Sequence, residues 1–184
     1  MNHVALRLAS LALAALVAPS CLVTAKQDFP APPQTAPFLS ASDAKPSLEH
    51  LVIDVDGKQK ITFDTTVRSE DDGVPLEARL IYDDPFPETA RYVLVDRTFI
   101  EASTFADVGR HVTLTFDPAV PLITKGTIGP GCHRFTLLVS HSFRFPLNQP
   151  ETVGDQDFLV WWVVVGDPKD PSFAGTVTAA SCTP

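Results

Sequence analysis

Apolar and polar residues alternate with a period of two from Ser47 onward, and the pattern recurs through most of the chain. Successive side chains of an extended strand point to opposite faces, so each such segment predicts a strand with one face in a core and the other in water. The positions expected to face the core are Leu51, Ile53 and Val55; Ile61, Phe63, Thr65 and Val67; Leu76, Ala78, Leu80 and Tyr82; Val112, Leu114 and Phe116; and Phe135, Leu137 and Val139.

Two further segments, residues 92–95 and 158–165, are apolar without alternation. The second is apolar on both faces and contains Trp161 and Trp162. Such a strand is expected in the middle of a sheet, or with its second face covered by a loop. The segment 142–157, which contains Phe143, is the candidate cover.

The pattern contains no amphipathic helix of three turns, and a single helical turn is expected at residues 104–108. About seven strands are predicted, with an eighth candidate at residues 175–180. Short strands separated by turn signals, such as Asp56-Gly57, favour an all-β fold, an antiparallel two-sheet sandwich. A small closed barrel is the alternative.

The first twenty residues differ from this pattern and predict a signal peptide over residues 1–20. Arg7 precedes residues 8–18, which are apolar except for Ser10. A positive charge, a short apolar run and small residues are typical of secretory signals. About 20 apolar residues are needed to span a bilayer as a helix, and this run is shorter.

Two cleavage sites compete after the signal. Residues 18–21 resemble the lipobox of bacterial lipoproteins, in which the cysteine, here Cys21, becomes the lipidated first residue. By resemblance to Gram-negative lipoproteins, Leu22 after that cysteine implies transport to the outer membrane. Cleavage after Ala25 is the alternative, and it would give a periplasmic or secreted protein. Residues 21–46 are rich in proline and predict an extended tether, followed by one domain over residues 47–184.

The late strands carry a family resemblance. Residues 131–140, Gly-Cys-His-Arg-Phe-Thr-Leu-Leu-Val-Ser, resemble the sixth strand of bacterial cadherin-like and PKD-like domains. The strand around Trp161 and Trp162 resembles lipoproteins of soil bacteria that are largely uncharacterised. The resemblance implies an immunoglobulin-like sandwich over residues 47–166, and it carries no activity with it.

Three cysteines are present, and removal of Cys21 by lipidation or cleavage leaves Cys132 and Cys182. Disulfides persist in exported proteins, so these two form the expected pair. Two buried free thiols are the alternative. Neither cysteine has the neighbouring spacing of a zinc site, and no metal or cofactor is predicted.

Composition excludes some partners. The chain carries 14 Lys and Arg against 22 Asp and Glu, a net charge of −8. This balance argues against nucleic-acid binding and against docking on anionic lipid through a basic patch. The remaining candidate partners are a membrane reached through the N-terminal lipid and an envelope protein or polysaccharide.

The candidate chemical groups are few. The acidic stretches at residues 54–57, 70–73 and 83–84 are interpreted as turns, with calcium binding as the alternative. His133 is expected at the edge of the core, bonded to a loop carbonyl. The glycine-rich residues 126–131 lack the lysine of a nucleotide loop and predict a turn.

We therefore expect a non-enzymatic, lipid-anchored envelope protein that serves as a structural or interaction module. The alternative is a carbohydrate-binding module whose ligand platform is Trp161, Trp162 or the 142–157 loop. An enzyme with a pair of carboxylates brought together from different loops is the third hypothesis, since sequence does not show spatial proximity.

Overall fold

A computed structural model describes residues 34–54, 57–83, 93–103, 109–118, 120, 131–144, 149–166 and 182. The chain divides into two units, Met1–Pro33 and Gln34–Pro184, and every described residue lies in the second. The predicted signal peptide, Cys21 and Ala25 lie outside the described residues, as do the predicted turn at 104–108 and the strand at 175–180. None of the described helices has the length and hydropathy of a membrane span.

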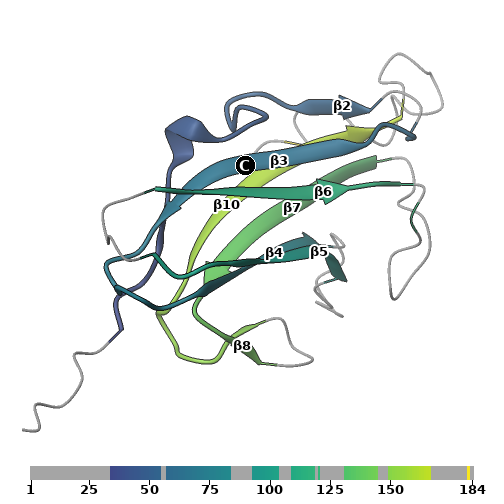
Figure 1. The fold of residues 1–184 in the computed structure, drawn as a ribbon. Helices are drawn as coiled ribbons and strands as arrows, with labels where there is room; N and C mark the ends of the chain where they lie inside the picture. The colour runs from purple at the N-terminus through teal and green to yellow at the C-terminus, as the bar shows by residue number, and fades with distance from the viewer. Residues whose placement is uncertain are drawn as a thin grey trace, which may run out of the picture. The chain divides into compact units, whose positions relative to one another are not determined.

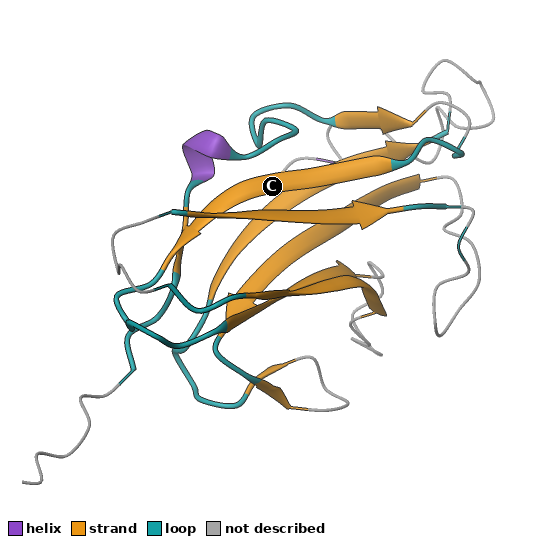
Figure 2. Cartoon of the chain, viewed as in Figure 1, coloured by secondary structure: helices purple, strands orange, loops and turns teal. Residues whose placement is uncertain are grey.

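Two β-sheets and one short hairpin make up the described fold, with a single 3-10 turn, η2 (Ala41–Asp43) (Figures 1 and 2). The first sheet has the order β1-β3-β6, formed by Phe38–Leu39, Ile61–Arg68 and Arg110–Phe116. The second has the order β2-β10-β7-β4-β5, formed by Val52–Asp54, Asp157–Val165, Gly131–Ser140, Leu76–Asp83 and Val93–Ile100. The hairpin pairs β8 (Phe143–Arg144) with β9 (Gln149–Pro150).

Within each of the two sheets, neighbouring strands are antiparallel, apart from the parallel pair β2 and β10. The predicted all-β, two-sheet sandwich is therefore confirmed. β5 is longer than the predicted segment 92–95, because residues 96–100, Asp-Arg-Thr-Phe-Ile, are neither continuously apolar nor alternating.

The core lies between the two sheets and is built around aromatic rings. The ring of Phe63 on β3 lies 5.0 Å from that of Trp161 and 5.5 Å from that of Phe135, between ring centroids. Phe116 on β6 lies 5.0 Å from Phe135. Tilted and offset pairs at this distance stabilise a core beyond the area that they bury. The inward positions predicted for β3, β6 and β7 are confirmed, and all are buried.

β2 faces the opposite way from the prediction. Ile53 is 48% exposed, whereas Asp54 is completely buried. The Asp54 carboxylate accepts hydrogen bonds from the backbone N–H groups of Lys58 and Gln59, and its carbonyl accepts one from Gly166. This side chain organises the turn that follows, in which Gly57 has a φ of 63°. In so short an edge strand, the hydrogen bonds that satisfy the buried Asp54 carboxylate outweigh the burial of the alternate apolar side chains.

The expected tether extends less far than Pro46. Phe38–Leu39 pairs with β3, and Leu39 is 2% exposed. Lys45 bridges to Asp64 through two backbone hydrogen bonds. The sandwich therefore begins at Phe38, because an edge strand of two residues needs no long alternating pattern to dock.

The outer face of β4 is buried, although the alternation predicted it to be wet. Glu77, Arg79 and Ile81 are each less than 9% exposed. The hairpin covers this face, and the guanidinium carbon of Arg79 lies 4.3 Å from the ring centroid of Phe143. β10 has a neighbour on each side, as expected, but the 142–157 segment leaves Phe158 54% exposed.

Candidate ligand-binding groove

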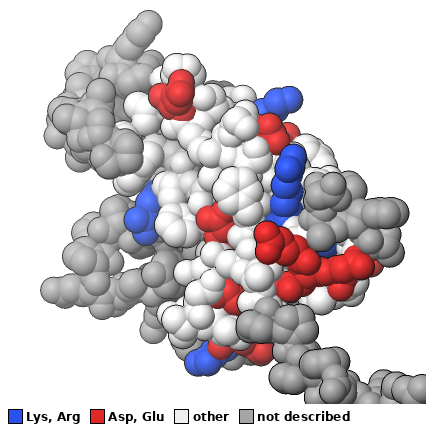
Figure 3. All heavy atoms as spheres, turned by 90° about the vertical axis from the view of Figure 1, so that its left-hand side faces the viewer, with Lys and Arg blue, Asp and Glu red and all other residues white. Residues whose placement is uncertain are grey.

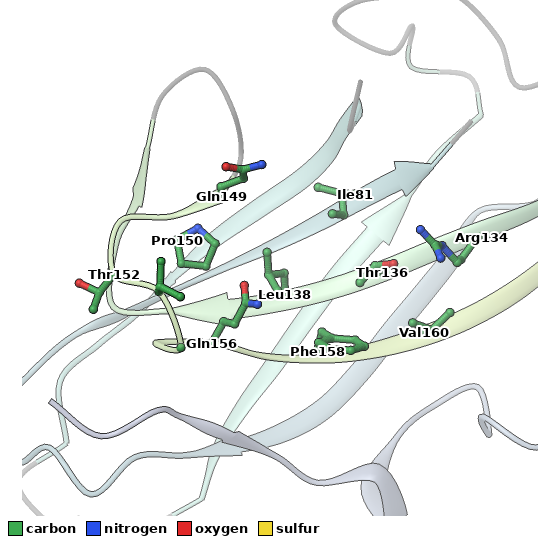
Figure 4. Close-up of a pocket in the computed structure, with 12 residues that line it drawn as sticks. Ile81, Arg134, Thr136, Leu138, Gln149, Pro150, Thr152, Gln156, Phe158 and Val160 are labelled. Carbon is green, nitrogen blue, oxygen red and sulfur yellow. The ribbon is translucent and has the colours of Figure 1, made fainter. Parts of the chain in front are cut away.

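The outer face of the five-stranded sheet carries a groove of about 450 Å³. Its floor follows β7 and β10, on which Phe158 lies opposite Leu138 and Val160 opposite Thr136. One wall comes from residues 149–156, which lie across from β10 (Figure 4). The lining residues are Ile81, Arg134, Thr136, Leu138, Gln149, Pro150, Thr152, Val153, Gly154, Gln156, Phe158 and Val160. This volume lies within the range of about 300–1,000 Å³ that is usual for small-molecule sites.

The two tryptophans have separate roles. Trp161 is 1% exposed, contacts Phe63 in the core and donates a hydrogen bond of 2.7 Å from Nε1 to the Pro46 carbonyl. The expectation that Trp161 could serve as a ligand platform is therefore wrong. Trp162 lies on the outer face opposite Arg134 and is half-buried. The exposed aromatic side chain in the groove is Phe158, which the sequence analysis did not single out although it begins the two-faced apolar run.

The wall of the groove is fastened by a buried polar cluster. The carboxylate of Asp155 accepts hydrogen bonds from the Ser140 hydroxyl at 3.0 Å and the His141 backbone at 3.2 Å. It also lies 2.6 Å from Nδ1 of His141. Gly154 and Gln156, on either side of Asp155, line the groove. The position of the wall therefore depends on this carboxylate.

His141 extends the cluster to another loop. Its Nε2 lies 3.2 Å from Oδ2 of Asp71, an electrostatic contact without the alignment of a hydrogen bond. The same Asp71 oxygen accepts hydrogen bonds from the backbone N–H and the hydroxyl of Thr35. The His141 imidazole thus links the groove wall to the β3–β4 turn. Asp71 in that turn links both to Thr35, at the start of the described chain.

This cluster contains serine, histidine and aspartate but lacks the arrangement of a nucleophilic site. The hydroxyl of Ser140 donates to Asp155 rather than to His141, so the imidazole is not placed to take its proton. The side chains of His141 and Asp155 are 3% and 4% exposed, which leaves no room for a substrate. The geometry is that of a structural clamp.

Metal binding finds no support within the described residues, where no group of His, Cys, Asp or Glu is placed to hold an ion. The Asp54 carboxylate accepts hydrogen bonds from the backbone of the turn that follows it, as expected for a turn, whereas the Asp71 carboxylate accepts one from the distant backbone N–H of Thr35. Of the other acidic residues in these stretches, Glu70 and Asp72 are exposed, whereas Asp56 and Asp84 lie outside the described residues.

The other predicted residues lie away from the groove floor. Cys132 and Cys182 form the predicted disulfide, with 5.7 Å between their Cα atoms. His133 is 7% exposed at the edge of the core, as expected, and its Nδ1 forms a hydrogen bond of 2.8 Å with the Tyr82 hydroxyl. Of the glycine-rich stretch, residues 126–130 lie outside the described residues.

A second, shallower depression lies at the end of β5, around Phe99 and Arg110. Phe99 is 68% exposed there. Burial lowers the pKa of Arg110, whose guanidinium donates to the Glu101 carbonyl at 2.8 Å. This depression is more open to solvent than the groove.

Acidic side chains gather on one end of the sandwich. Figure 3 faces the end at which β3 and β5 finish and β4 begins, and carboxylates are concentrated there. The exposed acidic residues at this end include Glu70, Asp72 and Glu101. No described residue that lines the groove is acidic, so the groove differs in charge from this end of the protein.

Comparison with known proteins gives little further information. No family model and no curated protein matches the chain. Similar solved structures include β-glucosidase from Listeria innocua in complex with glucose, at 17% identity and a TM-score of 0.44, and in complex with gluconolactone, at 16% and 0.45. Each match covers 72% of this chain but 16% of the enzyme, so the chain spans about a sixth of that length. A likeness this distant carries no function across.

Proposed function

We propose that this protein is a non-enzymatic, lipid-anchored module of the cell envelope that binds a partner in the groove on its five-stranded sheet. The observation that carries the proposal is a contrast in the use of polar groups. The buried polar residues of the clamp hold the fold together, whereas the groove combines an exposed aromatic ring with exposed amides. Sites of this composition are typical of binding.

The anchoring part of the proposal rests on residues 1–37, which precede the sandwich. The apolar signal, the lipobox-like residues 18–21 and the proline-rich stretch together favour lipidation at Cys21 and an outer-membrane location. One lipidated cysteine with several acyl chains would anchor the domain firmly. A tether of proline-rich chain would then hold the domain away from the membrane surface.

The proposed module has an immunoglobulin-like topology, and the order of the strands supports this assignment. In that fold the third, sixth and seventh strands lie side by side in one sheet, while the second and fifth lie side by side in the other. If β3 is taken as the second strand, then β4, β7 and β10 are the third, sixth and seventh, and β6 is the fifth. The observed neighbours β4-β7-β10 and β3-β6 follow this order.

Labelling with a radioactive fatty acid in a Gram-negative host tests the anchor. We expect label on the wild-type protein and none on Cys21→Ala, which should move from the membrane fraction to the soluble fraction. A labelled Cys21→Ala protein, or an unlabelled wild type released from cells, contradicts the anchor.

Sedimentation with isolated envelope material tests the binding face. The soluble Cys21→Ala protein should sediment with the material, and the further change Phe158→Glu should reduce the bound fraction. Phe99→Glu is the matched control, since Phe99 is also an exposed phenylalanine of the same sheet but lies outside the groove. Equal loss with both variants, or with neither, contradicts the groove as the binding face.

A further inference from the structure

The floor of the groove presents side chains but no unpaired strand edge. Its floor strands β7 and β10 each have a hydrogen-bonded neighbour on both sides, in the order β2-β10-β7-β4. A peptide that binds by adding a strand needs a sheet edge, and the floor presents none. Recognition in the groove therefore depends on the shape and chemistry of the side chains.

Those side chains form an apolar strip bordered by uncharged polar groups. Phe158, with 54% of its surface exposed, continues along the floor into Val160, and Leu138 lies opposite Phe158 (Figure 4). Gln149 and Gln156, both exposed, contribute amides that donate and accept hydrogen bonds. A sugar ring has a C–H face that packs on an aromatic ring and hydroxyls around its rim that bond to amides. A purely apolar ligand would leave the amides without partners.

Charge narrows the ligand further. Arg134 reaches the groove at the end away from Phe158, and no described lining residue is acidic. A guanidinium has five N–H donors in a planar fork, so it can bind a ligand carboxylate while keeping a partner within the protein. In a protein of net charge −8, a groove whose described lining residues include one arginine and no acidic residue favours a ligand that carries carboxylates at short range.

We propose that the groove binds a glycan chain that bears carboxylate groups, with one sugar ring packed on Phe158 and a neighbouring uronate paired with Arg134. This inference rests on the proposed function, because it names the ligand of the same groove. It also replaces Trp161 by Phe158 as the aromatic platform.

Titration calorimetry on the detergent-solubilised full-length protein tests the inference. The probe is an oligogalacturonate, and the control probe is the same oligosaccharide with its carboxyl groups reduced to alcohols. We expect binding to the acidic probe, and affinity weaker by about tenfold or more for the reduced one, since a charge-assisted hydrogen bond to arginine is lost.

Three variants separate the contributions of the side chains. Phe158→Ala should weaken binding of the acidic probe by about tenfold, since an aromatic contact is worth about one power of ten. Arg134→Gln should weaken the acidic probe by a similar factor and change the reduced probe by less than about twofold. Phe99→Ala should change neither, and unchanged urea midpoints establish that all three variants fold.

The results distinguish a wrong ligand class from a wrong binding face. Equal affinity for both probes, no binding to either, or binding that is insensitive to Phe158→Ala overturns the inference. If Phe158→Glu still abolishes sedimentation with envelope material while no probe binds, the ligand class is wrong and the binding face stands. If sedimentation also ignores Phe158, the proposed function fails as well.

Discussion

The two faces of the five-stranded sheet are built from the same strands in the same register, yet they differ in burial and in the kind of side chain that they present. The inner face presents fully buried apolar side chains such as Phe135, Leu137 and Trp161. The outer face mixes a buried ion pair under the hairpin with the half-open groove beside it. Adjacent residues on one strand can therefore differ completely in role, because a strand turns neighbouring side chains to opposite faces.

The matched pair of variants Trp161→Ala and Trp162→Ala tests the difference between the two faces most directly. Trp161→Ala should lower the free energy of unfolding by about 3–5 kcal/mol, because it leaves a cavity in the core. It also removes the hydrogen bond to the Pro46 carbonyl. Trp162→Ala should cost about 1–2 kcal/mol, in proportion to the smaller apolar area that it buries. Urea unfolding followed by circular dichroism measures both.

Trp162→Phe sharpens the same test. The indole nitrogen of Trp162 is buried and makes no hydrogen bond within the described residues. Removing an unsatisfied donor should leave stability unchanged or slightly raised. If Trp162→Ala destabilises as much as Trp161→Ala, the outer face is not the open surface described above.

Arg79→Met tests the covered half of the outer face. Nε of Arg79 lies 2.8 Å from Glu77 Oε1, and both side chains are buried under the hairpin. Removing one partner leaves a buried carboxylate and should cost about 3 kcal/mol. The double variant Glu77→Leu/Arg79→Met should recover most of this loss, because it removes both charges together. A double variant as unstable as the single one would contradict the buried pair as the cause.

Asp155→Asn tests the clamp that holds the groove wall. An amide keeps the size of the side chain but loses the charge that faces His141, and about 1–3 kcal/mol of stability should be lost. Hydrogen exchange should accelerate in residues 149–156 more than in β7 or β10. Uniform acceleration along the whole chain would mean that the clamp supports the entire fold and not the wall alone.

Asp43→Asn should have the smallest effect, and that effect should depend on pH. A hydrogen bond from Ser40 is the main cause that lowers the pKa of Asp43 below its ordinary value of 3.8. A lowered pKa stabilises the folded state above the unfolded value, and this contribution is lost as the pH falls through the folded value. Unfolding curves of wild type and variant should therefore differ slightly near neutral pH and converge as the pH falls through the pKa of Asp43 in the folded state. A difference that grows on acidification would contradict this sign.

Much of the sandwich was predictable because its central strands alternate. β3, β6 and β7 each follow the rule that inward positions are mostly apolar, and the residues predicted to face inward are buried. The rule fails at β2, where Asp54 turns inward to bond the following turn, and at β4, whose second face is covered by the hairpin. In both places a contact with a distant or irregular segment outweighs the local pattern.

The candidate site was less predictable than the fold. The 142–157 segment was expected either to cover the second face of residues 158–165 or to serve as a ligand platform, and in the structure residues 149–156 form a wall of the groove. Ser140, His141, Asp155 and Asp71 carry no recognisable spacing, although they meet in one buried cluster. Nothing in the local pattern distinguishes Phe158 from Trp161, since both belong to one apolar run.

The sequence by itself determined the class of the fold, the identity of most core-facing residues and the pairing of Cys132 with Cys182. Period-two alternation is a local property and cysteine parity is a count. Both can therefore be obtained without knowing which segments pack together. The tertiary structure alone decided which face of β10 is packed and which is open, and where the wall of the groove is fastened. These features depend on which segments meet across the sheet, and that pairing joins residues far apart in the chain.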